Sequence, residues 1–539
     1  MIQVAHAVML SSGWKRALIA FLAGALAAAA MPPLDLIVAL GLSLPVAIWL
    51  IDGAVESAIP GERGLNWPAI RMAGAIGWCF GFGYFLAGLW WLGAAFLVET
   101  DQFLWLMPFG VIGLPAGLAL FHAVGFALAR CLWMPGAGRI LAFAFAMAAV
   151  EWLRGNILTG FPWNLFGQAF GAFDVTAQVA SLIGLDGLNV LALLIFAAPA
   201  VIATGASARA RWSLPVLALA ALAVIVAFGT IRLGNAETGL VPGVKLRIVQ
   251  ANISERDKLK PGSGQATLST YLSLSDRATA PGASGIGDVT HLIWPESAFP
   301  FILANEPRAL AEIGAFLPPG TTLITGAVRT EPPRPGKRLP RYFNALQVVD
   351  SDGVITQSYD KVHLVPFGEY LPAEPLLSAL GLRKFVPEPG DFEAGPKRRL
   401  LDVPGLPPVL PLICYEAVFP YELTSGTGRP GVMINVTNDA WFGETFGPYQ
   451  HFAEARLRAV EQGVPLVRAA NTGISGVVDA YGRVLHRTTL GARTVLDAGL
   501  PRALAPTLFA RLGGLVFAGM MALLLLGVLT LRQLALRVE

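Results

Sequence analysis

Long apolar stretches place the strongest constraint on how this chain can fold. A helix that crosses a bilayer needs about 20 mostly apolar residues. Candidate stretches lie at roughly 17–31, 36–51, 72–98, 103–129, 140–153, 187–204, 213–231 and 512–531. Of all residues, 55% are hydrophobic and only 14% are charged, whereas soluble domains carry about 25% charged residues. The sequence therefore predicts a multi-span α-helical membrane domain.

Charge and cysteine usage exclude several other classes of protein. The net charge is only +3, and no basic run is interleaved with aromatic residues, so we expect no nucleic-acid partner. Cys79 and Cys131 lie within or beside apolar spans and are expected to pack there. No CxxC pair or Cys/His cluster is present, so we expect neither a metal nor a cofactor.

The basic residues predict which loops face the cytoplasm. They fall in alternate loops: Lys15 and Arg16, Arg63 and Arg71, Arg130 and Arg139, Arg209 and Arg211, and Arg532 and Arg537. Both termini are then cytoplasmic, and the large segment between the seventh and eighth spans lies outside. In a bacterium with two membranes, that segment would be periplasmic. Arg232 and Arg511 fall on the opposite side, but they flank a large domain, where the rule is weak.

Three regions follow from these patterns. Residues 1–240 form a transmembrane domain with an outer loop at 154–186, residues 241–503 form an α/β domain, and residues 504–539 contain the eighth span and a tail. In the second region, short β-rich runs alternate with helical patterns and Pro/Gly-rich loops, which predicts a layered α/β fold. The loops at 332–340 and 387–396 are candidate lids. At the end of the fifth span, Glu151 and Arg154 are expected to pair across one turn.

Cys414 is the candidate reactive residue, because it comes directly after a short apolar strand predicted at 409–413. Taken alone, a cysteine there could equally pack as a small hydrophobic residue. Two other segments, 293–297 and 359–363, carry the charged residues Glu296 and Lys361 in strand-then-turn settings. A carboxylate can take the thiol proton, while an ammonium can favour thiolate near neutral pH and stabilise an oxyanion.

The ordered motifs resemble a known superfamily. Trp294-Pro295-Glu296, Asp360-Lys361 with Pro366-Phe367-Gly368-Glu369-Tyr370, and Ile413-Cys414-Tyr415-Glu416 resemble the Glu-Lys-Cys triad of the nitrilase, or carbon–nitrogen hydrolase, superfamily. Together with the spans, they resemble its membrane-embedded branch, which N-acylates apolipoproteins. The motifs Glu151-Trp152-Leu153-Arg154, Thr159-Gly160-Phe161-Pro162-Trp163 and Asn435-Val436-Thr437-Asn438-Asp439-Ala440-Trp441-Phe442 add to this resemblance.

The resemblance implies a four-layer αββα sandwich and a Glu-Lys-Cys site. Cys414 would be the nucleophile, Glu296 the general base and Lys361 the electrostatic stabiliser. Supporting roles would fall to Glu369, to the backbone N–H of Tyr415 as an oxyanion donor, and to Glu416 beside the nucleophile. Leu259 stands where similar sequences often have a tryptophan.

The resemblance also implies the reaction and its setting. A fatty acyl chain would pass from a phospholipid, through a cysteine thioester, to the α-amino group of the diacylglyceryl-cysteine of an apolipoprotein. The kinetics would be ping-pong. The enzyme would be a monomer in the bacterial inner membrane.

Two other functions remain open on the residues alone. A membrane-tethered amidase or nitrilase could use the same triad and release its thioester to water, although one span would suffice as a tether. A transporter would need ionisable residues in several spans, and here His122 and Glu151 stand nearly alone.

Glu369 could also serve structurally, paired with Lys361 or Arg383. His363 and His451 are expected to be structural, since the triad needs no imidazole.

Overall fold

The fold comes from a computed structural model, which divides the chain into two compact units. It describes residues 1–54, 66–98, 103–134, 136–204, 207–237, 239–258, 260–279, 285–336, 339–379, 384, 391–423 and 428–538. One unit comprises Met1–Gly93, Trp105–Asn235 and Thr507–Glu539, and the other comprises Ala94–Leu104 and Ala236–Pro506. Leu259 and Arg383, considered above, lie outside the described residues.

The first unit is all helical, and each apolar stretch named above coincides with one of its helices. The helices are α1 Ile2–Met9, α2 Gly13–Ala28, α3 Val38–Asp52, α4 Trp67–Leu89, α6 Leu114–Cys131, α7 Gly138–Asn156, α8 Asp174–Ala177, α9 Ala180–Ala197, α10 Ala208–Gly234, α16 Leu508–Leu512 and α17 Gly514–Val538. In the described part of the chain, five helical segments are long and apolar enough to cross a membrane: Trp67–Leu97, Leu104–Cys131, Ala180–Ala203, Ala208–Gly234 and Gly514–Leu534.

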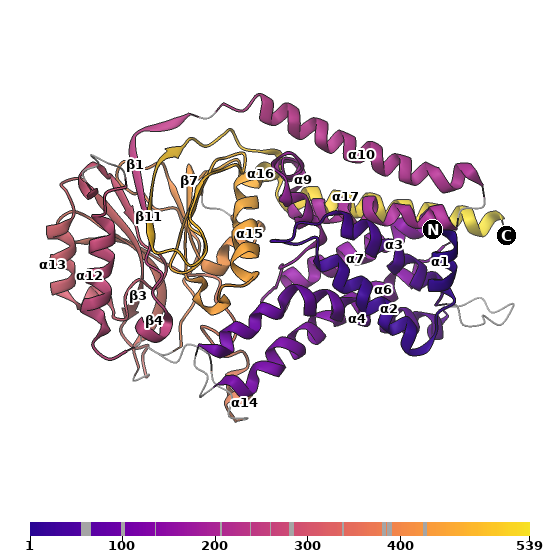
Figure 1. Cartoon of the computed structure of the whole chain (residues 1–539), viewed down its shortest axis with the longest axis horizontal. Coiled ribbons are helices and arrows are strands. Elements are labelled where there is room, and N and C mark those ends of the chain that lie inside the picture. The colour runs from indigo at the N-terminus through magenta and orange to yellow at the C-terminus, as the bar shows by residue number, and fades with distance from the viewer. Residues whose placement is uncertain are drawn as a thin grey trace. The chain divides into compact units, whose positions relative to one another are not determined.

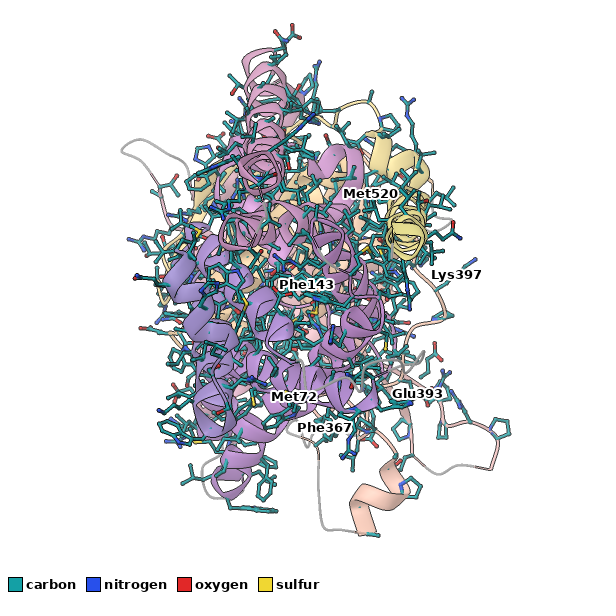
Figure 2. The ribbon with its side chains drawn as sticks, turned by 90° about the vertical axis from the view of Figure 1, so that its right-hand side faces the viewer. Met72, Phe143, Phe367, Glu393, Lys397 and Met520 are labelled. Carbon is teal, nitrogen blue, oxygen red and sulfur yellow. The ribbon has the colours of Figure 1, made fainter. Side chains whose placement is uncertain are left out.

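The interior of the helical unit is mainly apolar, and it contains a buried ionic cluster. Phe143 of α7 lies among the helices and is fully buried (Figure 2). On the same helix, Arg154 pairs with Glu151 one turn away, as the spacing predicted. The second carboxylate oxygen of Glu151 lies 2.6 Å from His122 Nε2 of α6. Charges this deep in an apolar unit persist because they are paired with one another.

The second unit contains two β-sheets. Six strands form one sheet in the order β11-β1-β2-β3-β4-β5, and five form the other in the order β10-β9-β8-β7-β6. The strands are β1 Leu240–Gln250, β2 His291–Ile293, β3 Thr322–Glu331, β4 Arg341–Val349, β5 Ile355–Asp360, β6 Val409–Ile413, β7 Val432–Thr437, β8 Leu466–Ala470, β9 Gly476–Val478, β10 Val484–Arg487 and β11 Thr494–Pro501.

The two sheets stack face to face and helices cover their outer faces. Alternate residues of β1 show why: Leu246 and Ile248 join the core between the sheets, whereas Val249 joins the core outside the first sheet. The helices are α11 Glu255–Lys258, α12 Ser263–Ser275, α13 Pro307–Phe316, α14 Glu374–Ala379 and α15 Gly447–Gln462. Figure 1 shows α12 and α13 on one side of the strands and α15 on the other. The unit is therefore a four-layer αββα sandwich, as predicted.

Strand direction brings the motif residues to one edge of the sandwich. β1, β2 and β3 run parallel, and β5 shares their direction because β4 is antiparallel to both β3 and β5. In the other sheet, β6, β7 and β8 are parallel. β6 is an edge strand, which accommodates Pro411, a residue without a backbone donor.

Candidate active site

Cys414 lies on a sharp turn directly after β6. Its φ is 50°, in the left-handed region that is unfavourable for a residue with a side chain. A short 3₁₀ helix, Cys414–Val418, begins at this residue. The thiol interacts with the side chains of Glu296 and Thr437. The strained turn thus presents the sulfur to a carboxylate from the other sheet.

Glu296 follows β2 and is held at both oxygens. Asn344 Nδ2 donates to Oε1 over 2.7 Å, and the backbone N–H of Asn438 donates to Oε2 over 2.9 Å. A Cβ atom at position 326 would stand 2.4 Å from the Cα of Glu296, so glycine is required there. The carboxylate therefore has one defined orientation beside the thiol.

Lys361 extends β5 by one residue, since its N–H donates to the carbonyl of Asn344 over 2.8 Å. Its side chain is 1% exposed, and Nζ lies 2.9 Å from Glu369 Oε2 and 3.6 Å from Glu296 Oε1. It also interacts electrostatically with the thiol of Cys414. The three residues of the predicted triad thus lie together, drawn from positions 296 to 414 of the sequence.

Asn344 is the site residue that the sequence did not reveal. Its amide donates to Glu296 Oε1 and to Glu369 Oε1, each over 2.7 Å. Glu369 also accepts the N–H of Val365 over 2.7 Å. One buried amide therefore holds two carboxylates side by side while Lys361 lies against both. In the sequence, Asn344 is simply a polar residue at the start of a β-rich run, which gives no signal of this role.

Electrostatics set the protonation states of the triad. Burial raises the pKa of Glu296, and Glu369 raises it further, against the opposing effect of Lys361. Burial alone would lower the pKa of Lys361, but the carboxylates of Glu369 and Glu296 outweigh it and raise that pKa above the usual range. Lys361 is thus an ammonium at neutral pH.

The expectation of a thiolate near neutral pH is wrong for this structure. Burial and the neighbouring Glu296 raise the pKa of the Cys414 thiol well above its usual value, although Lys361 opposes them. Two carboxylates, Glu296 and Glu369, face a single ammonium, so another negative charge at the sulfur is disfavoured. The resting sulfur is a neutral thiol, and its proton must leave during the attack.

Tyr415 and Glu416 have different surroundings. The Tyr415 ring packs edge-on against Phe419 with centroids 4.9 Å apart. Glu416 is fully buried and turns toward the loop after β5, where Oε1 accepts the N–H of Val362 over 2.8 Å. Its other oxygen, Oε2, accepts the N–H of Ile413 over 2.8 Å. Glu416 therefore ties the segment carrying Lys361 to the segment carrying Cys414.

The two histidines near the motifs both have structural partners. His363 Nδ1 lies 2.7 Å from Glu422 Oε1, and its ring stacks on Phe419 at 3.8 Å. His451 of α15 lies between Asp439 and the backbone of Cys414. Among the described residues, no group of His, Cys, Asp or Glu side chains is arranged to hold a metal ion.

Replacing Asn344 with leucine is expected to lower kcat/KM by about 10- to 100-fold, because each charge-assisted hydrogen bond contributes about 1.5–3 kcal/mol. Loss of its amide donors also raises the pKa of Glu296 further, which moves the acid limb of the pH–rate profile to higher pH. Kinetics across pH would measure both effects. Gln347→Leu is the matched control, since Gln347 is a buried polar residue of the same strand on the opposite face. Equal losses in the two variants would contradict this role for Asn344.

Replacing Glu416 with glutamine is expected to destabilise the α/β unit by about 3 kcal/mol, because breaking a buried charged network costs about that much. Besides the backbone bonds above, Glu416 Oε1 accepts the Tyr359 hydroxyl over 3.0 Å and lies 3.5 Å from Arg398 NH1. A glutamine amide would direct N–H groups at some of these donors. The apparent unfolding temperature should fall, whereas it should change little for Glu422→Gln, whose side chain is 33% exposed.

Comparison with known proteins decides the family. An apolipoprotein N-acyltransferase of Rhodopseudomonas palustris is 50% identical over 528 residues, covering 98% of this chain and 97% of its own. The chain belongs to the apolipoprotein N-acyltransferase family. Another apolipoprotein N-acyltransferase, from Bradyrhizobium diazoefficiens, is 48% identical and covers 97% of this chain and 96% of its own.

Two family models match the chain in separate regions. The model of the apolipoprotein N-acyltransferase N-terminal domain matches residues 23–198, and the carbon–nitrogen hydrolase model matches residues 245–507. A solved carbon–nitrogen hydrolase from Helicobacter pylori aligns with 48% of this chain and 88% of its own, at 15% identity and a TM-score of 0.34.

Family membership shows the class of enzyme and the membrane setting of this chain. The chain is an N-acyltransferase built on a carbon–nitrogen hydrolase domain, and it is a bacterial membrane protein. The amidase or nitrilase alternative is not favoured, because relatives over nearly the full chain are named as acyltransferases.

Proposed function

We propose that this protein transfers a fatty acyl chain from a phospholipid to the α-amino group of an apolipoprotein's diacylglyceryl-cysteine, through a thioester on Cys414. The main support is the side-chain interaction between the Cys414 thiol and Glu296, with the Lys361 ammonium 3.6 Å from the same carboxylate. A nucleophile, a base and a fixed cation in contact are what acyl transfer through a thioester requires.

In the first half-reaction, Glu296 takes the thiol proton as the sulfur attacks the ester carbonyl of the phospholipid. The carbonyl oxygen becomes an oxyanion, which the Lys361 ammonium and the backbone N–H of Tyr415 stabilise. The intermediate then collapses with cleavage of the C–O bond. Glu296 returns its proton to the leaving oxygen, so a lysophospholipid departs and a thioester remains. The raised pKa of Glu296 suits both steps, since the same group must accept a proton and then donate it.

In the second half-reaction, the α-amino group of the apolipoprotein attacks the thioester. An α-amino group has a pKa of about 8, so part of it is already neutral at working pH. Glu296 accepts the proton of the amine, the C–S bond breaks, and the sulfur regains a proton. Because both substrates use one nucleophile in turn, the kinetics are ping-pong.

The proposed setting follows the distribution of basic residues. Both termini lie in the cytoplasm, and the α/β unit lies on the periplasmic side of the inner membrane. Glu369 and Asn344 hold the triad, and the enzyme works as a monomer without metal or cofactor. Both lipid substrates can then keep their acyl chains in the bilayer.

Mass spectrometry of the purified enzyme tests this function. Mixed with phospholipid and no acceptor, the enzyme should gain one acyl mass, and peptide mapping should place it on Cys414. Addition of a diacylglyceryl-cysteine peptide should remove that mass and yield an N-acylated peptide. An adduct on another residue would contradict the nucleophile. Loss of the adduct to water at the same rate with and without peptide would contradict acyl transfer.

A further inference from the structure

A fully buried polar cluster lies directly beneath the nucleophile. Its members, Asn435, Thr437, Asp439, His451 and Arg468, are at most 1% exposed and come from β7, β8, α15 and the turn after β7. Asp439 Oδ2 accepts from Arg468 NH2 over 2.9 Å, and Oδ1 accepts the Thr437 hydroxyl over 3.0 Å. Burial alone would raise the pKa of Asp439, but Arg468 and His451 lower it to about 2. Asp439 is therefore a carboxylate that fixes the cluster.

His451 connects this cluster to the backbone of the nucleophile. Its Nε2 lies 3.2 Å from the carbonyl oxygen of Cys414, and its Nδ1 lies 3.0 Å from Arg468 NH2 and 2.9 Å from Asp439 Oδ1. A carbonyl oxygen carries no proton, so Nε2 must be the donor in this contact. Burial and Arg468 lower the pKa of His451. The Nε2 proton is therefore donated to the Cys414 carbonyl, while Nδ1 faces both the Arg468 guanidinium and the Asp439 carboxylate.

The carbonyl that His451 binds belongs to the same peptide group as the N–H of Tyr415. The peptide unit is planar and trans, so its C=O and N–H point in opposite directions. A hydrogen bond that holds the C=O toward the buried cluster therefore holds the Tyr415 N–H the other way. The bond also polarises the peptide group, which strengthens its N–H as a donor. Holding the Cys414–Tyr415 peptide in place matters because Cys414, at φ 50°, has an unfavourable backbone conformation. Without the hydrogen bond, this peptide could rotate to relieve that strain.

We propose that His451 is a positioning residue for the oxyanion hole: its bond to the Cys414 carbonyl aims the N–H of Tyr415 at the oxygen of the tetrahedral intermediate. The inference rests on the proposed function, because it assumes an acyl intermediate on Cys414. His451 touches no substrate in this role. Asp439 and Arg468 orient its ring, and Arg468 in turn is bound to Asn435, whose amide donates to the carbonyl of Leu412 over 3.1 Å.

The test compares two reactions of the same sulfur. Acylation by phospholipid builds an oxyanion and needs the hole, whereas alkylation by iodoacetamide displaces iodide and builds none. In detergent-solubilised His451→Leu, we expect single-turnover acylation of Cys414 to slow by about 10- to 100-fold, with the KM for phospholipid little changed. Alkylation of Cys414 should stay within about twofold of wild type. His451→Gln keeps an N–H near the position of Nε2 and should recover most of the acylation rate.

His291→Leu is the matched control. His291 is also a buried histidine of this unit, and its Nε2 donates to a backbone carbonyl, that of Pro404, over 2.8 Å. That bond lies away from the peptide of the nucleophile, so the ratio of acylation to alkylation should stay at the wild-type value.

Three outcomes would contradict the role of His451 or the proposed function. A parallel fall of acylation and alkylation in His451→Leu would show that His451 only maintains the turn, and would overturn the inference. Unchanged acylation in that variant would overturn it as well. Absence of any Cys414 adduct in the wild-type enzyme would instead overturn the proposed function, and the inference with it.

Discussion

Cys414→Ala should abolish acyl transfer, with a fall of at least about 10⁴-fold, because removal of a covalent nucleophile removes the reaction path itself. Cys414→Ser should be almost as inactive. A hydroxyl is far harder to deprotonate than a thiol, and Glu296 is placed to take a proton from sulfur. The rate of N-acylation of a diacylglyceryl peptide measures both losses.

The other cysteines provide the controls for this experiment. Cys79 and Cys131 are in the helical unit and only partly buried, so Cys79→Ala and Cys131→Ala should retain activity. Cys414 lies at a turn beside the core between the sheets, and alanine removes only its sulfur atom, so the alanine variant should nearly keep the unfolding temperature of the wild type. Residual turnover by Cys414→Ala above about 1% of wild type would contradict its role as the nucleophile.

Glu296→Gln should lower kcat/KM by about 10³- to 10⁴-fold, the upper part of the range for loss of a general base. The amide keeps the shape of the side chain but accepts no proton. In the wild-type enzyme Glu296 must be ionised to act, so activity is lost as pH falls through its pKa. Because burial raises that pKa, the acid limb should lie above the value of about 4.3 for an ordinary glutamate.

The pH profile separates a base from a structural carboxylate. In Glu296→Gln the small residual rate should no longer show the acid limb. Glu312→Gln makes the same chemical change on the exposed face of α13, where Glu312 accepts from Gln265 over 2.9 Å, and its profile should match the wild type. An unchanged acid limb in Glu296→Gln would assign that limb to a different group.

Local patterns predicted the elements whose signal lies within the segment itself. The buried strand at 409–413 has the predicted bounds, because every one of its residues is buried and the run is continuously apolar. The strands β10 and β11 were not predicted. β11 pairs with β1 across about 250 residues of sequence, for example Leu496 with Ile248, and only the assembled sheet gives it a partner.

The candidate site likewise contains residues that could be predicted from the sequence and residues that could not. Glu296, Lys361 and Cys414 could be chosen in advance because each follows a strand, and strand ends gather at one edge of a sheet. Asn344 and His451 could not, since their roles depend on contacts made only after folding. Asn344 is 48 residues from Glu296, and His451 is 37 residues from Cys414. The candidate lids at 332–340 and 387–396 stay predictions, and residues 337–338 and 387–390 lie outside the described part of the chain.

The protonated state of the resting nucleophile also has a consequence for how long the enzyme survives. Peroxides and disulfides react with thiolates far faster than with thiols. A sulfur whose pKa is raised by burial and by Glu296 stays protonated between turnovers, so it is slow to form sulfenic acid or mixed disulfides. If the α/β unit works outside the cytoplasm, where no glutathione pool repairs such damage, we expect the negative charge around Cys414 to slow oxidative inactivation of the enzyme between turnovers.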